Sequence, residues 1–187
     1  TSFTIRYSPS SILVTSWFQS PYTDYDKANG IEKASAELCG FAKTDILAPG
    51  ASETVNITVD KSELRTYDAN NAKTYIVDAG DYYFTAATDA HNAVNNILAA
   101  KGYTVENTAD GDASLVYTWN NPALDTTTYA VSANGTAITN LFDEADPNKS
   151  SSEPGEVTWL SRSNWVATFP TQPVVLNATQ TLADHLA

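Results

Sequence analysis

Residues 54–60, TVNITVD, alternate polar and apolar side chains at every position. A period of two is typical of a strand with one buried and one solvated face. The side chains expected on the buried face are Val55, Ile57 and Val59. Residues 52–60 are therefore predicted to form a half-buried strand, and this pattern restricts the fold more than any other in the chain.

Other short segments rich in β-branched and aromatic residues extend this prediction. Further strands are predicted at residues 11–18, 36–44, 74–78, 81–87, 114–119 and 127–132. Turn-forming residues predict loops at 19–30, 48–50, 69–73 and 133–135. Short strands separated by turns are typical of an antiparallel β-sandwich, so the predicted fold class is mostly β.

Residues 88–100 break this pattern, because they favour a short helix. Thr88 or Asp89 can cap its start, and Gly102 can end it. The apolar residues expected on one stripe are Ala90, Val94, Ile97 and Leu98. We expect this helix to cap the end of the sandwich.

The charge balance restricts the partners. A net charge of −12 repels a phosphate backbone and an anionic membrane surface, so neither nucleic acid nor membrane is expected, whereas sugars remain compatible. No apolar run approaches the ~20 residues of a membrane span. The single cysteine, Cys39, excludes an intrachain disulfide, which fits the bacterial cytoplasm or a bacterial secreted protein without disulfides.

Four stretches carry a resemblance to a known family. LCGFAK (Leu38 to Lys43), LAPGASETV (Leu47 to Val55), ELRTYD (Glu63 to Asp68) and VDAGDY (Val77 to Tyr82) follow one another in this order. Together they make residues 18–105 resemble the fibronectin type III-like domain of family 3 glycoside hydrolases. The resemblance implies an immunoglobulin-like sandwich that serves as a non-catalytic module.

Residues 142–148, FDEADPN, and 157–170, VTWLSRSNWVATFP, resemble a bacterial branch of that family with permuted domains. There the domain lies between the α/β-sandwich and barrel domains, which carry the catalytic residues of β-glucosidases and related exo-glycosidases. The resemblance implies a division of the chain into four parts. Residues 1–17 form a segment that does not match the family, and residues 18–105 form the sandwich. Residues 106–148 form an added hairpin and acidic segment, and residues 149–187 form an extension that leads into a barrel. The expected partners are the catalytic domains, with rumen or gut bacteria as hosts.

Catalytic candidates are few, and no cofactor is expected. His91 is a candidate base, but the chain has no G-x-S-x-G elbow, the motif that carries the nucleophilic serine of many serine hydrolases. A Cys39–His91 pair is disfavoured because Cys39 lies in an apolar strand. Carboxylates that could be paired for glycoside hydrolysis are Glu32 with Glu37, or Asp143 with Glu144 and Asp146. Such clusters are usually solvated surface in an acidic protein. A stand-alone glycosidase or carbohydrate esterase remains the alternative to an accessory module, as does a purely structural domain.

Polar and aromatic side chains suggest two kinds of binding site. Oxygen ligands in one loop make Asp24, Asp26 and Asn29 calcium candidates, although not at EF-hand spacing. Sugar rings stack on flat aromatic side chains. The candidates for carbohydrate binding are Tyr22, Tyr25, Trp119, Trp159 and Trp165. Core or interface packing is the competing explanation for these aromatics, and the C-terminal ones favour self-association if they are exposed.

Overall fold

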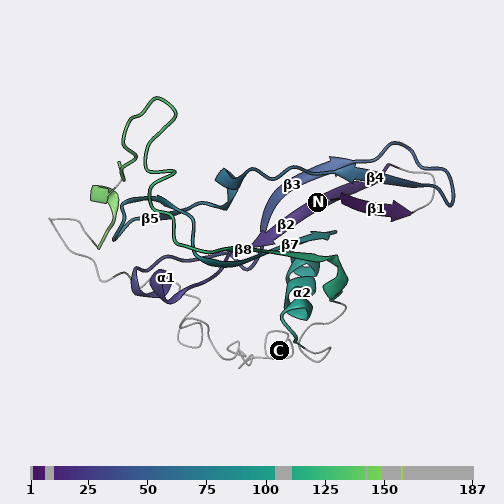
Figure 1. Ribbon diagram of the computed structural model, residues 1–187, viewed down its shortest axis with the longest axis horizontal. Coiled ribbons are helices and arrows are strands. Elements are labelled where there is room, and N and C mark those ends of the chain that lie inside the picture. Colours follow the sequence, from purple (N-terminus) through teal and green to yellow (C-terminus); the bar gives the residue numbers. More distant parts are fainter. Residues whose placement is uncertain (1, 7–10, 104–110, 142, 149–156, 158–187) are drawn as a thin grey trace, which may run out of the picture.

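The computed structural model describes residues 2–6, 11–103, 111–141, 143–148 and 157. Its main element is a four-stranded antiparallel sheet with the strand order β3-β2-β7-β8 (Figure 1). The strands of this sheet are β2 (Leu13–Gln19), β3 (Glu37–Lys43), β7 (Gly80–Ala87) and β8 (Val116–Asn121). Two smaller antiparallel pairs are β1 (Ser2–Arg6) with β4 (Ser52–Asn56), and β5 (Thr66–Asp68) with β6 (Thr74–Ile76).

One face of the large sheet carries the core. Successive strand residues point to opposite faces, so every second side chain of β2 and β7 turns towards the segment from β4 to residue 64. Two buried clusters result, one of Phe18, Leu64, Val77 and Tyr82, the other of Val14, Val55 and Ile57. The alternation predicted for 52–60 is confirmed by the burial of Val55 and Ile57, although β4 itself ends at Asn56.

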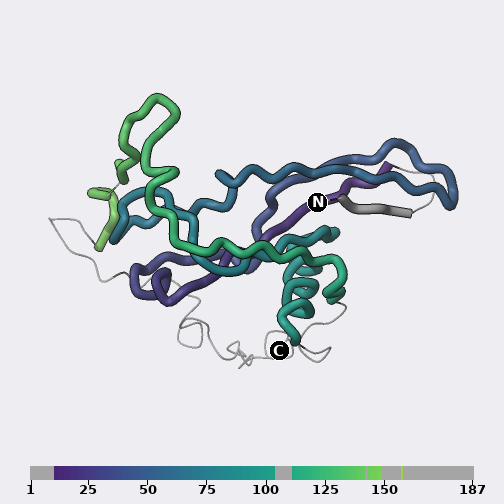
Figure 2. The backbone as a smooth tube through the Cα atoms, in the orientation of Figure 1, coloured from purple at the N-terminus to yellow at the C-terminus, as the bar shows by residue number. Residues whose placement is uncertain are grey.

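The opposite face of the sheet is partly covered by helix α2 (Ala90–Ala100), which Figure 2 shows lying on one side of the strands. Asn96 is buried there, and its amide nitrogen donates to the Thr85 hydroxyl at 3.2 Å. Its side-chain oxygen accepts from the Asp112 backbone amide at 2.9 Å. The helix thus rests on a face of the sheet, and the expectation that it caps the end of the sandwich was wrong.

The buried side of α2 also differs from the predicted stripe. Ala93, Asn96 and Ile97 are buried, whereas Ala90 is exposed. The spacing of apolar residues did not predict this buried side, because a hydrogen-bonded asparagine lies at its centre. The predicted ends are confirmed. Asp89 accepts from the Asn92 amide, and Gly102 adopts φ +87° in a Schellman ending, with Tyr103 N–H bonded to Leu98 C=O.

Two other predictions were wrong. Residues 19–30 contain the short helix α1 (Asp24–Ala28), because Thr23 and Asp26 form a capping box in which each side chain bonds the other's backbone amide. Residues 127–132 form turns, with only an isolated bridge between Val131 and Ala137. The remaining short helical turns are η1 (Lys61–Leu64), η2 (Ala113–Leu115) and η3 (Asp143–Ala145).

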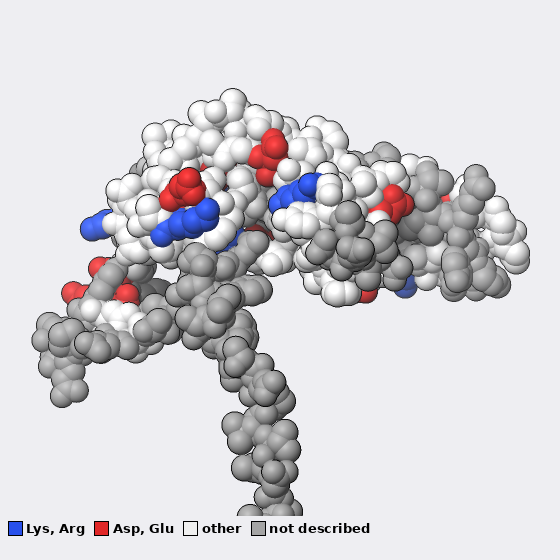
Figure 3. All heavy atoms as spheres, turned by 90° about the horizontal axis from the view of Figure 1, so that it is seen from below, with Lys and Arg blue, Asp and Glu red and all other residues white. Residues whose placement is uncertain are grey.

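Charged side chains are dispersed over one face of the described surface. On the face shown in Figure 3, the visible Lys and Arg residues stand singly or beside an acidic residue. None of the helices in the described ranges is long and apolar enough to cross a bilayer.

Candidate functional site: an aromatic pocket beside strand β8

Aromatic side chains line the core face of β7 and β8 at the open edge of the sheet. The register places Tyr82 opposite Trp119 and Phe84 opposite Tyr117. The ring centroids of Tyr82 and Trp119 are 5.3 Å apart, and those of Phe84 and Tyr117 are 6.4 Å apart. These spacings are typical of interacting aromatic pairs. The two strands therefore present a continuous aromatic surface.

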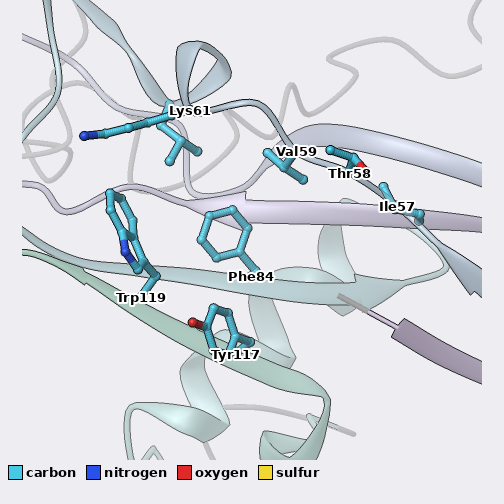
Figure 4. Close-up of a pocket in the computed structure, with 8 residues that line it drawn as sticks. Ile57, Thr58, Val59, Lys61, Phe84, Tyr117 and Trp119 are labelled. Carbon is cyan, nitrogen blue, oxygen red and sulfur yellow. The ribbon is translucent and has the colours of Figure 1, made fainter. Parts of the chain in front are cut away.

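A pocket of about 430 Å³ lies between this surface and the segment that follows β4. Figure 4 shows the rings of Phe84 and Trp119 directed from the sheet towards the segment carrying Val59 and Lys61. The lining residues are Ile57, Thr58, Val59, Lys61, Leu64, Phe84, Tyr117 and Trp119. A concave, mostly apolar site of this size with a few polar groups is suited to a small ligand.

Lys61 is the only charged side chain that the described residues contribute to the lining, and the short helix η1 positions it. Asp60 caps η1 by accepting from the Ser62 amide at 2.7 Å, and its bonds with Ser62 lower the pKa of the Asp60 carboxyl. The Lys61 ammonium lies 5.6 Å from the centre of the Trp119 ring. Among the described residues, the lining contains no carboxylate, histidine or cysteine.

A second cluster, the buried triad, consists of Lys33, Asp26 and Asp78. The Lys33 ammonium donates to Asp78 Oδ2 at 2.5 Å and to the Thr66 hydroxyl at 2.7 Å, and it lies 3.6 Å from Asp26 Oδ1. All three charged side chains are at most 1% exposed. Because solvent does not reach it, the triad is a structural feature of the core and not a ligand site.

Comparison with known families identifies a domain in the central part of the chain. The model of the fibronectin type III-like domain matches residues 22–90, a range that runs from the start of α1 to the start of α2. Residues 22–90 are a fibronectin type III-like domain. The resemblance seen in the sequence motifs is thereby confirmed. Strands β2 and β8 lie outside the matched range, yet both pair with β7, so the four-stranded sheet includes two strands from beyond residues 22–90.

A curated relative is a beta-glucosidase from Ruminococcus albus, 38% identical over 65 residues. The match covers 33% of this chain and 7% of that enzyme. Similar solved structures include beta-glucosidase 3B from Thermotoga neapolitana in complex with glycerol (18% identity, TM-score 0.45, 66% of this chain and 14% of that one). A beta-glucosidase from Paenibacillus barengoltzii is also similar (16% identity, TM-score 0.42, 63% of this chain and 11% of that one).

Three of the aromatic residues predicted to bind carbohydrate are among the described residues, and they do not lie together. Trp119 lines the pocket from within strand β8. Tyr22 and Tyr25 lie at α1, where Lys27 lies over the Tyr22 ring and the Tyr25 hydroxyl donates to Asp68. Neither lines the pocket. Trp159 and Trp165 lie outside the described residues.

Seven of the eight lining residues were not predicted as binding residues, among them Tyr117, Phe84 and Lys61. Tyr117 carried a usable signal, because it precedes Trp119 by two positions and a strand turns such residues to the same face. Phe84 and Lys61 reach the pocket through contacts between distant segments, and a local sequence pattern does not predict such contacts.

The nucleophile and base candidates are placed apart from the pocket. His91 lies exposed on the first turn of α2, with Nε2 3.5 Å from the Asn95 amide nitrogen. Cys39 is half-buried and donates to the Ser16 carbonyl, and burial raises the pKa of its thiol, which favours the unreactive form.

The acidic candidates lie on different parts of the surface or core. Glu32 is exposed, while Glu37 is half-buried in β3, and burial raises the pKa of the Glu37 carboxyl. Asp143 and Glu144 belong to η3, and Asp146 follows it, accepting from the Asn148 amide.

The calcium candidates bond to different partners. Asp24 pairs with Lys27, Asp26 belongs to the buried triad, and the Asn29 amide nitrogen donates to the Tyr25 carbonyl. Within the described part of the chain, no group of three or more His, Cys, Asp or Glu side chains could hold a metal ion.

Proposed function

We propose that this chain is a non-catalytic accessory module of a family 3 glycoside hydrolase of the β-glucosidase type. The observation that carries the proposal is the 38% identity with a short segment of the Ruminococcus albus beta-glucosidase, a segment that makes up only 7% of that enzyme. The fibronectin type III-like domain at residues 22–90 supports it. The partners expected for the module are the catalytic domains of its parent.

We further propose that the aromatic pocket beside β8 binds an oligosaccharide weakly. Tyr117 and Trp119 offer flat faces on which the C–H faces of sugar rings can stack, and the Thr58 and Tyr117 hydroxyls can bond sugar hydroxyl groups. Tyr117 is 56% exposed and therefore accessible to a ligand. Such a site would hold substrate close to the catalytic domains.

One experiment tests both parts. The purified chain is assayed with aryl β-glucosides and aryl esters beside the His91→Ala variant, and titrated with cello- and xylo-oligosaccharides by NMR. We expect no turnover by either protein, and oligosaccharide-induced shifts at β7 and β8. Turnover abolished by His91→Ala would overturn the accessory role and establish a hydrolase.

A matched pair of variants locates the binding. Tyr117→Ala removes an exposed ring from the pocket, whereas Tyr103→Ala removes a ring of similar exposure (54%) after α2. We expect Tyr117→Ala alone to weaken oligosaccharide binding, at unchanged circular dichroism. Equal effects of the two variants would contradict the assignment of the pocket.

A further inference from the structure

The charge in the pocket is opposite to that of the protein. The chain has a net charge of −12, yet the only charged residue among the described residues that line the pocket is a lysine. Sites for neutral sugars depend on hydrogen-bond acceptors such as Asp or Asn to hold pairs of hydroxyl groups. Within the part of the chain that the structure describes, no Asp, Asn, Glu or Gln side chain lines the pocket. The polar groups of the pocket therefore favour a ligand that carries a hydrogen-bond acceptor.

The ammonium group of Lys61 is held where such a ligand would present its charge. Figure 4 shows the Lys61 side chain extended above the Trp119 ring, and the ammonium lies 5.6 Å from the ring centre. Among the described residues, Lys61 makes this cation–π contact and no ion pair. An exposed cation–π contact contributes little, so a carboxylate on the ligand can attract the ammonium away from the indole.

We infer that the pocket selects a sugar ring that carries a carboxylate, that is, a uronic acid residue. The apolar face of the ring stacks on Trp119 and Tyr117, and the carboxylate accepts a hydrogen bond from the Lys61 ammonium. This inference rests on the proposed carbohydrate binding and specifies its ligand class.

The test compares two ligands that differ only at one carbon. Methyl β-D-glucuronide carries a carboxylate where methyl β-D-glucoside carries a hydroxymethyl group, and NMR titration measures weak binding of both. We expect the glucuronide to bind about two- to five-fold more tightly, the range of an exposed ion pair. Raising the salt concentration should reduce that preference, because salt screens exposed charges.

Lys61→Met is the diagnostic variant, because it keeps the apolar stem and removes the charge. Lys27→Met is its matched control, since Lys27 lies 5.7 Å from the centre of the Tyr22 ring in a similar contact that is not part of the pocket. We expect Lys61→Met to abolish the preference for the glucuronide and Lys27→Met to preserve it.

The possible outcomes separate the inference from the proposed function. Equal binding of the two glycosides, with the Tyr117→Ala variant binding both more weakly, would overturn the uronate selection and leave carbohydrate binding standing. Binding of neither would overturn both. Tighter binding of benzoate than of the glucuronide would also overturn the inference, because the pocket would then recognise a carboxylated ring without sugar hydroxyls.

Discussion

The Lys33 ammonium lies 2.5 Å from Asp78 Oδ2, and both side chains are about 1% exposed. This pair joins the loop before β3 to the connection between β6 and β7, and the third member of the triad, Asp26, adds helix α1. Two oxygen atoms of the triad, Asp26 Oδ1 and Asp78 Oδ1, have no hydrogen-bond partner among the described residues. A proton on the Asp78 carboxyl, donated to Asp26, would satisfy both.

Lys33→Met should be among the most destabilising substitutions in the chain. It removes the only cation from a site that holds two carboxyl groups, and uncompensated buried charge costs about 3–5 kcal/mol. Urea unfolding measures the change. Lys27→Met is the control, because Lys27 pairs with a fully exposed Asp24, and we expect less than about 1 kcal/mol there. Similar losses in the two variants would show that the triad does not hold the core together.

Asp78→Asn should change the pH dependence of stability. Burial, aided by the nearby Asp26 carboxylate, outweighs the Lys33 ammonium and raises the pKa of Asp78 above its ordinary value of 3.8. A raised pKa in the folded state gives stability that is present below pH 3.8 and is lost as the pH rises through the folded value. The amide introduced by the substitution does not titrate. The stability deficit of Asp78→Asn relative to the wild type should therefore be largest near pH 4 and shrink towards pH 7.

Unfolding in urea at a series of pH values tests this prediction. A deficit that grows as the pH rises would mean that Asp78 is stabilised as the carboxylate, and that the two unpartnered oxygens do not share a proton.

The strands, the triad and the pocket differ in how far the sequence could predict them. The strands around Val55, Ile57 and Tyr82 were predicted because period-two burial is local information. The role of Asp26 was not, because a polar loop and a buried helix start have the same composition, and only the contact with Lys33 distinguishes them. For the pocket, Trp119 was predicted from its chemistry, whereas Lys61 depended on how distant segments meet.

Gly40→Ala should destabilise the contact between β3 and the segment that follows β4. Gly40 lies opposite Ser16 on the core face of β3, and a Cβ atom there would lie 2.5 Å from Ile57 Cγ2. Overpacking of this kind costs about 1–3 kcal/mol. The double variant Gly40→Ala/Ile57→Ala removes the clashing methyl group and should lose less stability than the sum of the single variants. Additive losses would locate the cost of Gly40→Ala in the bulged backbone of β3 and not in the clash.

Tyr25→Phe should weaken the junction between α1 and the turn from β5 to β6, and should do so in a pH-dependent way. The Tyr25 hydroxyl donates to Asp68 Oδ2 at 2.6 Å, and the same buried carboxylate accepts from the amides of Asn70, Asn71 and Ala72. Burial raises the pKa of Asp68, but these hydrogen bonds outweigh it and hold the pKa below 3.8. The loss at pH 7 should be about 1.5 kcal/mol, as for a hydrogen bond to a charged group.

A lowered folded pKa gives stability that is present above pH 3.8 and is lost as the pH falls through the folded value. Removing the Tyr25 hydroxyl raises the Asp68 pKa towards its ordinary value, so the difference between Tyr25→Phe and the wild type should shrink as the solution becomes acidic. Tyr67→Phe is the matched control, because its hydroxyl donates at 3.2 Å to the neutral Lys73 carbonyl at the surface. Tyr67→Phe should lose little stability, and this loss should not depend on pH. The Tyr25 hydroxyl also accepts from the Asn71 side-chain amide at 2.9 Å. A pH-independent loss in Tyr25→Phe would show that the hydroxyl contributes through packing and this bond alone, and not through the charge of Asp68.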